Sequence, residues 1–173
     1  MPIIVSTLSA RALASTGRRL FLRGAAAAPL ALLARPAELR ATDYASASEV
    51  LDTIDRREAD VDGRLVAIAR AVAGVEAFAG SVRADHARHR AERHRLRRRL
   101  KLSAFAPPPP PAKPDLSLAA LREAQQQLVH AHAEGLPALG DGGAVDLLAH
   151  HMVDASRHLT VIDLWIEAEE TRG

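Results

Sequence analysis

Two short segments repeat the same residue types at the same spacing, and each combines a carboxylate with an imidazole. They are Asp85-His86-Ala87-Arg88-His89 and Asp154-Ala155-Ser156-Arg157-His158, both of the form Asp-x-(Ala/Ser)-Arg-His. Residues four apart lie on one face of a helix, so the Asp and the His of each segment can share a ligand. Carboxylate oxygens and imidazole nitrogens suit first-row divalent metals. The repeat therefore makes Asp85, His89, Asp154 and His158 candidate metal ligands.

A further acidic residue, Glu58, interrupts a stripe of apolar residues. It lies four residues after Ile54 and three before Val61, which places it on the same helical face as both. A carboxylate in such a stripe can ligate a metal or pair with a buried arginine. The sequence leaves both interpretations open.

The elements that must position these residues are helices. Aromatic residues make up only 3% of the chain, and few residues are strand formers. Apolar residues recur at spacings of three, four or seven over residues 50–72, 75–100, 118–136 and 145–166, which predicts four helices. Gly74 and Gly80-Ser81 predict a turn between the first two, with one long kinked helix as the alternative. Gly140 and Asp141-Gly142-Gly143 separate the last two helices.

A proline-rich link over residues 104–116 joins the two pairs of helices. Pro107 to Pro111 and Pro114 exclude a helix there. In polyproline form the link would reach about 40 Å at ~3.1 Å per residue, whereas a 20-residue helix is about 30 Å long. The link can therefore run the length of a bundle, so that the third helix starts at the opposite end.

This all-α pattern resembles the ferritin-like four-helix bundles, which have one long crossover connection, a Glu on two helices and Glu-x-x-His on the other two. The resemblance covers residues 45–171 and implies iron or manganese as the cofactor. The ligand positions that it implies are Glu58, Asp85, His89, Gln125, Asp154 and His158. The sequence departs from the family pattern because Asp-x-x-x-His replaces Glu-x-x-His and Gln125 offers a neutral oxygen. Both changes weaken a site for two divalent ions.

The N-terminal segment resembles a twin-arginine export signal. Arg18 and Arg19 are followed by Leu20, then by Phe21-Leu22 and a further basic residue, and an apolar run occupies residues 25–34. The resemblance implies a leader over residues 1–41, with cleavage as late as residue 47. It also implies transfer by the Tat export machinery to the periplasm or another extracytoplasmic location. Anchoring through an uncleaved leader stays open, and an arginine-rich transit peptide is the alternative.

Composition excludes several classes of function. The chain has no cysteine, which rules out disulfides, thiolate metal sites and cysteine nucleophiles. The net charge is +2, but residues 1–37 hold five of the 23 basic residues and none of the 21 acids, so the remainder carries about 18 − 21 = −3. No nucleic-acid partner is therefore expected. Gly-rich phosphate loops, Gly-x-Ser-x-Gly and His-Glu-x-x-His are absent from the sequence, and no catalytic residue is predicted.

Two groups of residues favour ordinary structural roles. The basic run from Arg83 to Lys101 predicts a solvated helix face that complements the acidic C-terminal half, with phosphate or anionic-lipid binding as the alternative. His130, His132, His150 and His151 are expected at the surface or at the boundary of the core.

Two functions follow as hypotheses. The first is an exported ferritin-like protein that binds iron or manganese, of the oxidase or storage type, and that forms either a monomer or a homodimer. The second is a metal-free extracytoplasmic helical interaction or stress-associated module that has kept the fold and lost the site.

Overall fold

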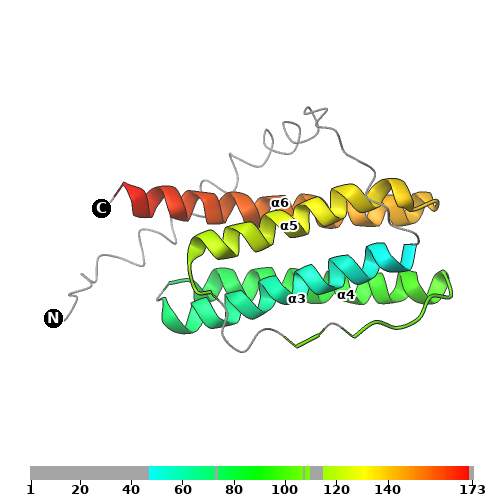
Figure 1. Cartoon of the computed structure of the whole chain (residues 1–173), viewed down its shortest axis with the longest axis horizontal. Coiled ribbons are helices and arrows are strands. Elements are labelled where there is room, and N and C mark those ends of the chain that lie inside the picture. The colour runs from blue at the N-terminus through cyan, green and yellow to red at the C-terminus, as the bar shows by residue number, and fades with distance from the viewer. Residues whose placement is uncertain (1–46, 73, 107, 110–114, 172–173) are drawn as a thin grey trace. The chain divides into compact units, whose positions relative to one another are not determined.

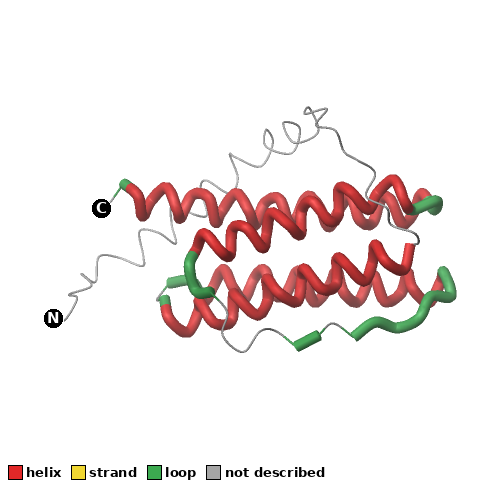
Figure 2. The backbone as a smooth tube through the Cα atoms, in the orientation of Figure 1, coloured by secondary structure: helices red, strands yellow, loops and turns green. Residues whose placement is uncertain are grey.

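The structure, a computed structural model, describes residues 47–72, 74–106, 108–109 and 115–171. The predicted leader, with Arg18, Arg19, Phe21 and Leu22, lies outside these residues. Over the described ranges the chain forms four α-helices and no strand (Figure 2). They are α3 (Ala47–Ala71), α4 (Glu76–Arg99), α5 (Leu118–Gly135) and α6 (Gly142–Glu170), with a short 3₁₀ turn, η1 (Leu136–Ala138), before α6. The all-α prediction is confirmed.

The helices form two antiparallel hairpins, α3–α4 and α5–α6, whose axes are roughly aligned (Figure 1). The packing is most extensive between α5 and α6 and between α3 and α5, and it is sparse between α4 and α6. In Figure 1, α4 ends and α5 begins at opposite ends of the bundle. No helix of the described residues is long and apolar enough to cross a bilayer.

The apolar stripes form the core, as the spacing predicts. The largest aliphatic side chains in it are Leu51, Ile54, Leu65, Ile68, Leu121, Leu128, Leu148 and Ile162, each at most 1% exposed. Burial of a side chain of this size is worth roughly 1.5–3 kcal/mol, which makes this layer the main source of stability. Ten polar or charged residues are buried in the same interior.

Two predicted helix boundaries differ from those in the structure. The first helix ends at Ala71 and the second begins at Glu76, and between them Gly74 has φ 92° and donates its N–H to Glu76 Oε2 at 2.8 Å. Gly80 and Ser81 lie inside α4 instead of in a turn, because the neighbouring Ala79 and Val82 are buried in the core. The packing of such residues outweighs the cost of about 1 kcal/mol for a helical glycine.

The α6 helix also starts earlier than expected. Gly142 and Gly143, predicted to break the chain, form its first turn. Asp141 makes this start favourable because its Oδ1 accepts a hydrogen bond from the N–H of Ala144 at 2.8 Å. In α5, Ser117 caps the helix in the same way, because its Oγ accepts a hydrogen bond from the N–H of Ala120 at 3.1 Å.

Gly135 permits a close approach of α5 to α3. A Cβ built at this position would overlap the Cγ1 atom of Val50, which is fully buried. We expect Gly135→Ala to lower the free energy of unfolding by about 1–3 kcal/mol, since a packed core resists an added methyl group. Urea unfolding measures the change. Gly80→Ala is the matched control, because its Cβ would meet nothing within 4 Å, and it should stabilise the chain by about 0.5–1 kcal/mol. A Gly135→Ala variant as stable as the parent would contradict the close approach.

Candidate functional site

Glu58 lies in the middle of α3, where the apolar stripe carries it into the interior. The guanidinium of Arg93, from α4, binds it with two donors: Nη1 donates to Oε1 at 3.2 Å and Nη2 donates to Oε2. The Nε of Arg93 donates to Asp55 Oδ1 at 2.8 Å. Arg93 and Glu58 are both 0% exposed, and Asp55 is 2% exposed. One buried cation therefore pairs with two carboxylates that lie one helical turn apart.

A second arginine extends this arrangement towards the end of α4. Arg97 Nη2 donates to Asp55 Oδ2 at 3.0 Å and to Asp52 Oδ1 at 2.7 Å. Asp55 thus accepts from Arg93 and Arg97 with its two oxygens. Arg90, half-buried, lies 3.0 Å from Asp62 on the other side. The acids of α3 and the arginines of α4 together form a ladder of ion pairs that is buried at its centre and partly exposed at its ends, composed of Asp52, Asp55, Glu58, Asp62, Arg90, Arg93 and Arg97.

The charges in this ladder are mutually stabilised. Burial by itself would raise the pKa of Glu58, but the neighbouring imidazole of His89 and the charge of Arg93 outweigh burial and hold the pKa well below its usual range. Burial would lower the pKa of Arg93, and the charges of Glu58 and Asp55 raise it instead. Both groups are therefore ionised at neutral pH.

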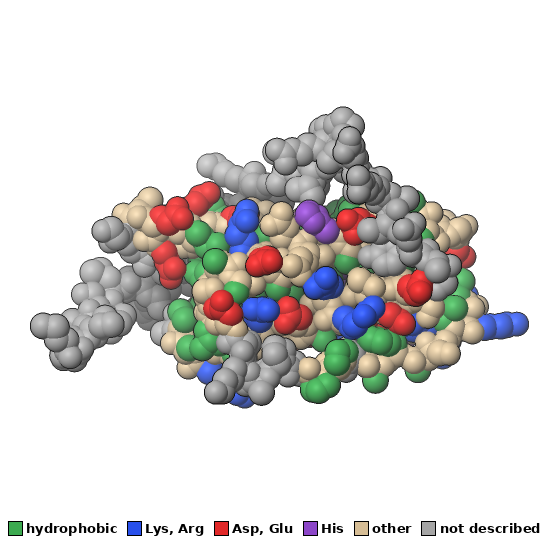
Figure 3. All heavy atoms as spheres, viewed as in Figure 1, with side chains coloured by type: hydrophobic (Ala, Val, Ile, Leu, Met, Phe, Trp, Pro, Cys, Tyr) green, Lys and Arg blue, Asp and Glu red, His purple; other side chains and the backbone are tan. Residues whose placement is uncertain are grey.

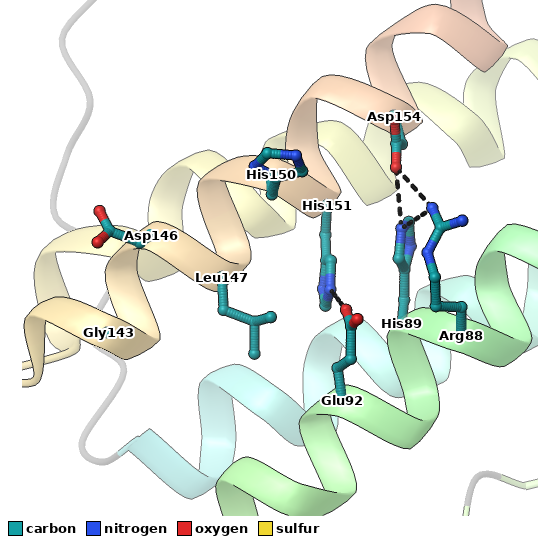
Figure 4. A pocket seen from close by; sticks show the side chains of 9 residues that line it. All are labelled: Arg88, His89, Glu92, Gly143, Asp146, Leu147, His150, His151 and Asp154. Carbon is teal, nitrogen blue, oxygen red and sulfur yellow. Dashed lines mark hydrogen bonds and ion pairs between the residues drawn. The ribbon is translucent and has the colours of Figure 1, made fainter.

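Histidine–carboxylate pairs connect α4 to α6. His89 Nε2 lies 3.2 Å from Asp154 Oδ2, and His158 Nε2 lies 3.2 Å from Asp85 Oδ2. The guanidinium of Arg88 joins the two pairs, since it lies 2.9 Å from Asp85 and 3.0 Å from Asp154. Figure 4 shows His89 and Arg88 of α4 pointing towards Asp154 of α6. The two Asp-x-(Ala/Ser)-Arg-His segments thus face each other, and each Asp contacts the His of the other segment.

A second layer of imidazoles lies beside these pairs. His151 Nε2 is 2.7 Å from Glu92 Oε2, as Figure 4 shows, and the ring of His151 stacks on that of His89 with centroids 4.0 Å apart. His132 of α5 meets His151 edge-on, and its Nδ1 donates to the carbonyl of Leu128 at 2.9 Å. His132 and His151 are each 1% exposed, so the expectation of surface or boundary positions is wrong for both. His130 and His150 are exposed, as expected.

Burial controls the protonation of these imidazoles. It lowers the pKa of His132 and of His158 to about 4 and that of His151 to about 2. For His151 the neighbouring charge of His89 lowers the pKa further, and for His158 the hydrogen bond to Asp85 only partly opposes burial. These three imidazoles are therefore neutral at pH 7.

A groove of about 640 Å³ opens between α4 and α6 above the histidine layer. Residues of both helices line it: Arg88, His89, Glu92, Gly143, Asp146, Leu147, His150, His151 and Asp154 (Figure 4). The lining is polar and carries both signs of charge. The face of the molecule in Figure 3 likewise interleaves acidic and basic side chains.

Five of the six predicted ligands are linked in one network. The Nδ1 atom of His89 lies 3.7 Å from Glu58 Oε1, and its Nε2 atom lies 3.2 Å from Asp154 Oδ2. The two carboxylates are therefore at different edges of the imidazole ring. Asp85 and His158 join the network through Arg88. Gln125 is separate: it is fully buried, and its Nε2 donates to the carbonyl of Ala155 at 2.9 Å.

This arrangement does not fit a pair of divalent ions. Glu58 already binds a guanidinium, Asp154 binds Arg88 and Arg157, and Gln125 brings no charge. Among the described residues, no three His, Asp or Glu side chains are grouped so that they could hold a metal ion. The donors lie side by side in pairs instead of converging on one point.

The sequence interpretation missed the two arginines at the centre of the ion-pair ladder. The basic run was expected to form a solvated face, but Arg93 and Arg97 are buried and pair with acids of α3. Pairing with the C-terminal half is limited to the outer members in the described residues: Arg88 contacts Asp154, and Arg99 contacts Asp141. Spacing could have found Arg93, because it fills the vacant position of the stripe between His89 and Leu96.

Comparisons with protein families, with curated proteins and with solved structures find no match for this chain.

Proposed function

We propose that the chain is an exported, ferritin-like helical bundle that acts without a metal as an interaction module. In this proposal the guanidinium of Arg93 supplies the positive charge that a metal ion would supply to the interior carboxylates. The observation that carries it is the pairing of Arg93 with Glu58 and Asp55, all three within the buried interior.

The order of the helices supports the ferritin-like assignment. Two antiparallel hairpins and a connection between opposite ends of the bundle are the features of a four-helix bundle with one long crossover. The proline-rich link over residues 104–116 is proposed to be this crossover. Fold alone does not define a function, so the metal-free assignment depends on the charges inside the bundle.

The charge balance of the interior supports the absence of a metal. Two divalent ions need several carboxylates, because an uncompensated charge in a protein interior costs several kcal/mol. In this interior Glu58 and Asp55 are already compensated by Arg93, and Gln125 stands where a carboxylate is expected. A divalent ion would place further positive charge beside Arg93 and would be repelled by it.

Binding of iron or manganese is the second candidate, and one observation favours it. Four buried imidazole nitrogens have no hydrogen-bond partner in the described part of the chain: His86 Nε2, His132 Nε2, His151 Nδ1 and His158 Nδ1. A nitrogen of this kind is a potential metal ligand. For this candidate the ligands would be Glu58, Asp85, His89, Asp154 and His158.

Thermal unfolding of the full chain separates the two candidates. The chain is treated with a chelator and then supplied with Fe²⁺ or Mn²⁺ in separate samples. A specifically bound ion stabilises the folded state by about 2.7 kcal/mol at 100 times its Kd, so binding would raise the unfolding temperature. We expect no rise.

The matched control for this titration is the double variant Asp154→Ala/His158→Ala. A rise in the parent that is lost in the double variant would establish the metal-binding function and overturn the metal-free one. Equal behaviour of the two proteins, with no rise in either, supports the metal-free module.

A further inference from the structure

The C-terminal end of α4 carries a set of exposed cations, of which Arg95 and Arg99 face a groove towards α6. This set, called here the basic end of α4, consists of Arg95, Arg98, Arg99 and Lys101. The side chains of Arg95 and Arg99 are 62% and 57% exposed. Four cationic side chains within seven residues produce a concentrated positive potential on one part of the surface.

The acids close to this set are largely occupied by other groups. Four acids of α3 bind the inner arginines of α4: Asp52, Asp55, Glu58 and Asp62. Glu92 lies 3.8 Å from Arg95 but is bound at 2.7 Å to His151.

On α6, Asp141 binds Arg99 at 2.9 Å while it also caps that helix. Asp146 is exposed on the α6 wall of the groove beside this end. The outer cations are therefore only partly neutralised, in contrast to Arg93 and Arg97.

The basic end of α4 lies at the end of the bundle where the first helix, α3, begins. The α3–α4 hairpin is antiparallel, so α3 begins at the same end of the bundle at which α4 terminates (Figure 1). The predicted leader immediately precedes α3 in the chain. A leader retained in a membrane would consequently tether the bundle at the end that carries these four cations.

We propose that the basic end of α4 docks on the anionic surface of a phospholipid bilayer. The inference rests on the proposed function only in that the chain is exported, and it adds that the leader is retained; it does not depend on whether a metal is bound. Each basic side chain at an anionic bilayer strengthens binding by about fivefold, and the attraction falls off within a Debye length of about 10 Å at 0.1 M salt. The tether supplies proximity, and the four cations orient the bundle on the surface.

Vesicle binding of the full chain tests this inference. The probes are vesicles of pure phosphatidylcholine and vesicles with about 30% phosphatidylglycerol, a composition that gives a negative surface. The test variant is Arg95→Gln/Arg98→Gln/Lys101→Gln. The control variant, Arg70→Gln/Arg83→Gln/Arg122→Gln, removes the same charge from exposed positions near the opposite end of the bundle. Both are also made in a chain whose leader arginines are neutralised by Arg18→Gln, Arg19→Gln and Arg23→Gln.

We expect the test variant to lose at least about tenfold in affinity for the phosphatidylglycerol vesicles, and the control variant less than about twofold. Raising the salt concentration should remove this difference. Equal losses in the two variants, or no loss in the test variant, would overturn the proposal. A test variant that keeps its vesicle affinity but loses binding to duplex DNA would overturn it in favour of a nucleic-acid partner. Metal content is measured separately, so failure of this inference leaves the proposed function standing.

Discussion

Replacement of Arg93 by methionine is expected to lower the free energy of unfolding by about 3–5 kcal/mol. Methionine keeps most of the side-chain volume, so the loss comes mainly from charge. Glu58 and Asp55 would remain buried without their shared cation, and removal of one partner of a buried ion pair leaves an uncompensated charge in the interior. Urea unfolding at neutral pH measures the change.

Arg95→Met is the control for this substitution. Arg95 lies on the same helix, but its side chain is 62% exposed and its nearest acid is 3.8 Å away. Such a surface change is expected to stay within about 0.5 kcal/mol of the parent. If Arg93→Met cost no more than Arg95→Met, the account of the interior charges would be wrong.

The bundle is also expected to lose stability in mild acid. Burial lowers the pKa of His132 and His158 from 6.5 to about 4, so the folded chain binds fewer protons than the unfolded chain between these values. Their contribution is complete above pH 6.5 and is lost as the pH falls towards 4. We expect the free energy of unfolding to be about 2–4 kcal/mol lower at about pH 5 than at about pH 7.5.

Glu58 also loses its contribution as the pH falls, but over a lower range of pH. Folding lowers the pKa of Glu58, so its contribution is present above the usual value of 4.5 and is lost only below it. The loss between pH 7.5 and 5 is therefore assigned to histidines. His132→Leu should remove about 2 kcal/mol of this pH dependence, whereas His130→Leu, at an exposed position, should leave it unchanged. Stability that is equal at the two pH values would exclude neutral buried histidines.

The helices and their order could be predicted from the sequence because each has a long apolar stripe. The two helix boundaries that were predicted wrongly lie at glycines. Gly80 lies in α4 because its neighbours pack in the core, and Gly142 and Gly143 begin α6 because Asp141 caps it. A local propensity of about 1 kcal/mol per glycine is smaller than the packing energy of a buried side chain, and packing is not visible in a local pattern.

The site was harder to predict because its chemistry depends on pairs between distant segments. The sequence identified Glu58 as an interior carboxylate and left open whether a metal or an arginine would meet it. Charge alone does not distinguish a buried arginine from a solvated one among the nine basic residues between Arg83 and Lys101, and only the place of Arg93 in the apolar stripe could have selected it. His132 and His151 were expected at the surface or at the boundary of the core. Spacing could have indicated the burial of His132, which continues the buried stripe of α5 after Leu128, but the contact between His132 and His151 joins two helices and is visible in neither alone.

The most direct measurement of the central claim is a double-mutant cycle between Arg93 and Glu58. The free energy of unfolding is measured for the parent, Arg93→Met, Glu58→Gln and the double variant. If the guanidinium serves as the interior cation of Glu58, the double variant should be more stable than the sum of the single losses predicts, with a coupling energy of about 2–3 kcal/mol. Losses that add within about 0.5 kcal/mol would mean that the two charges do not compensate each other, and would contradict the account.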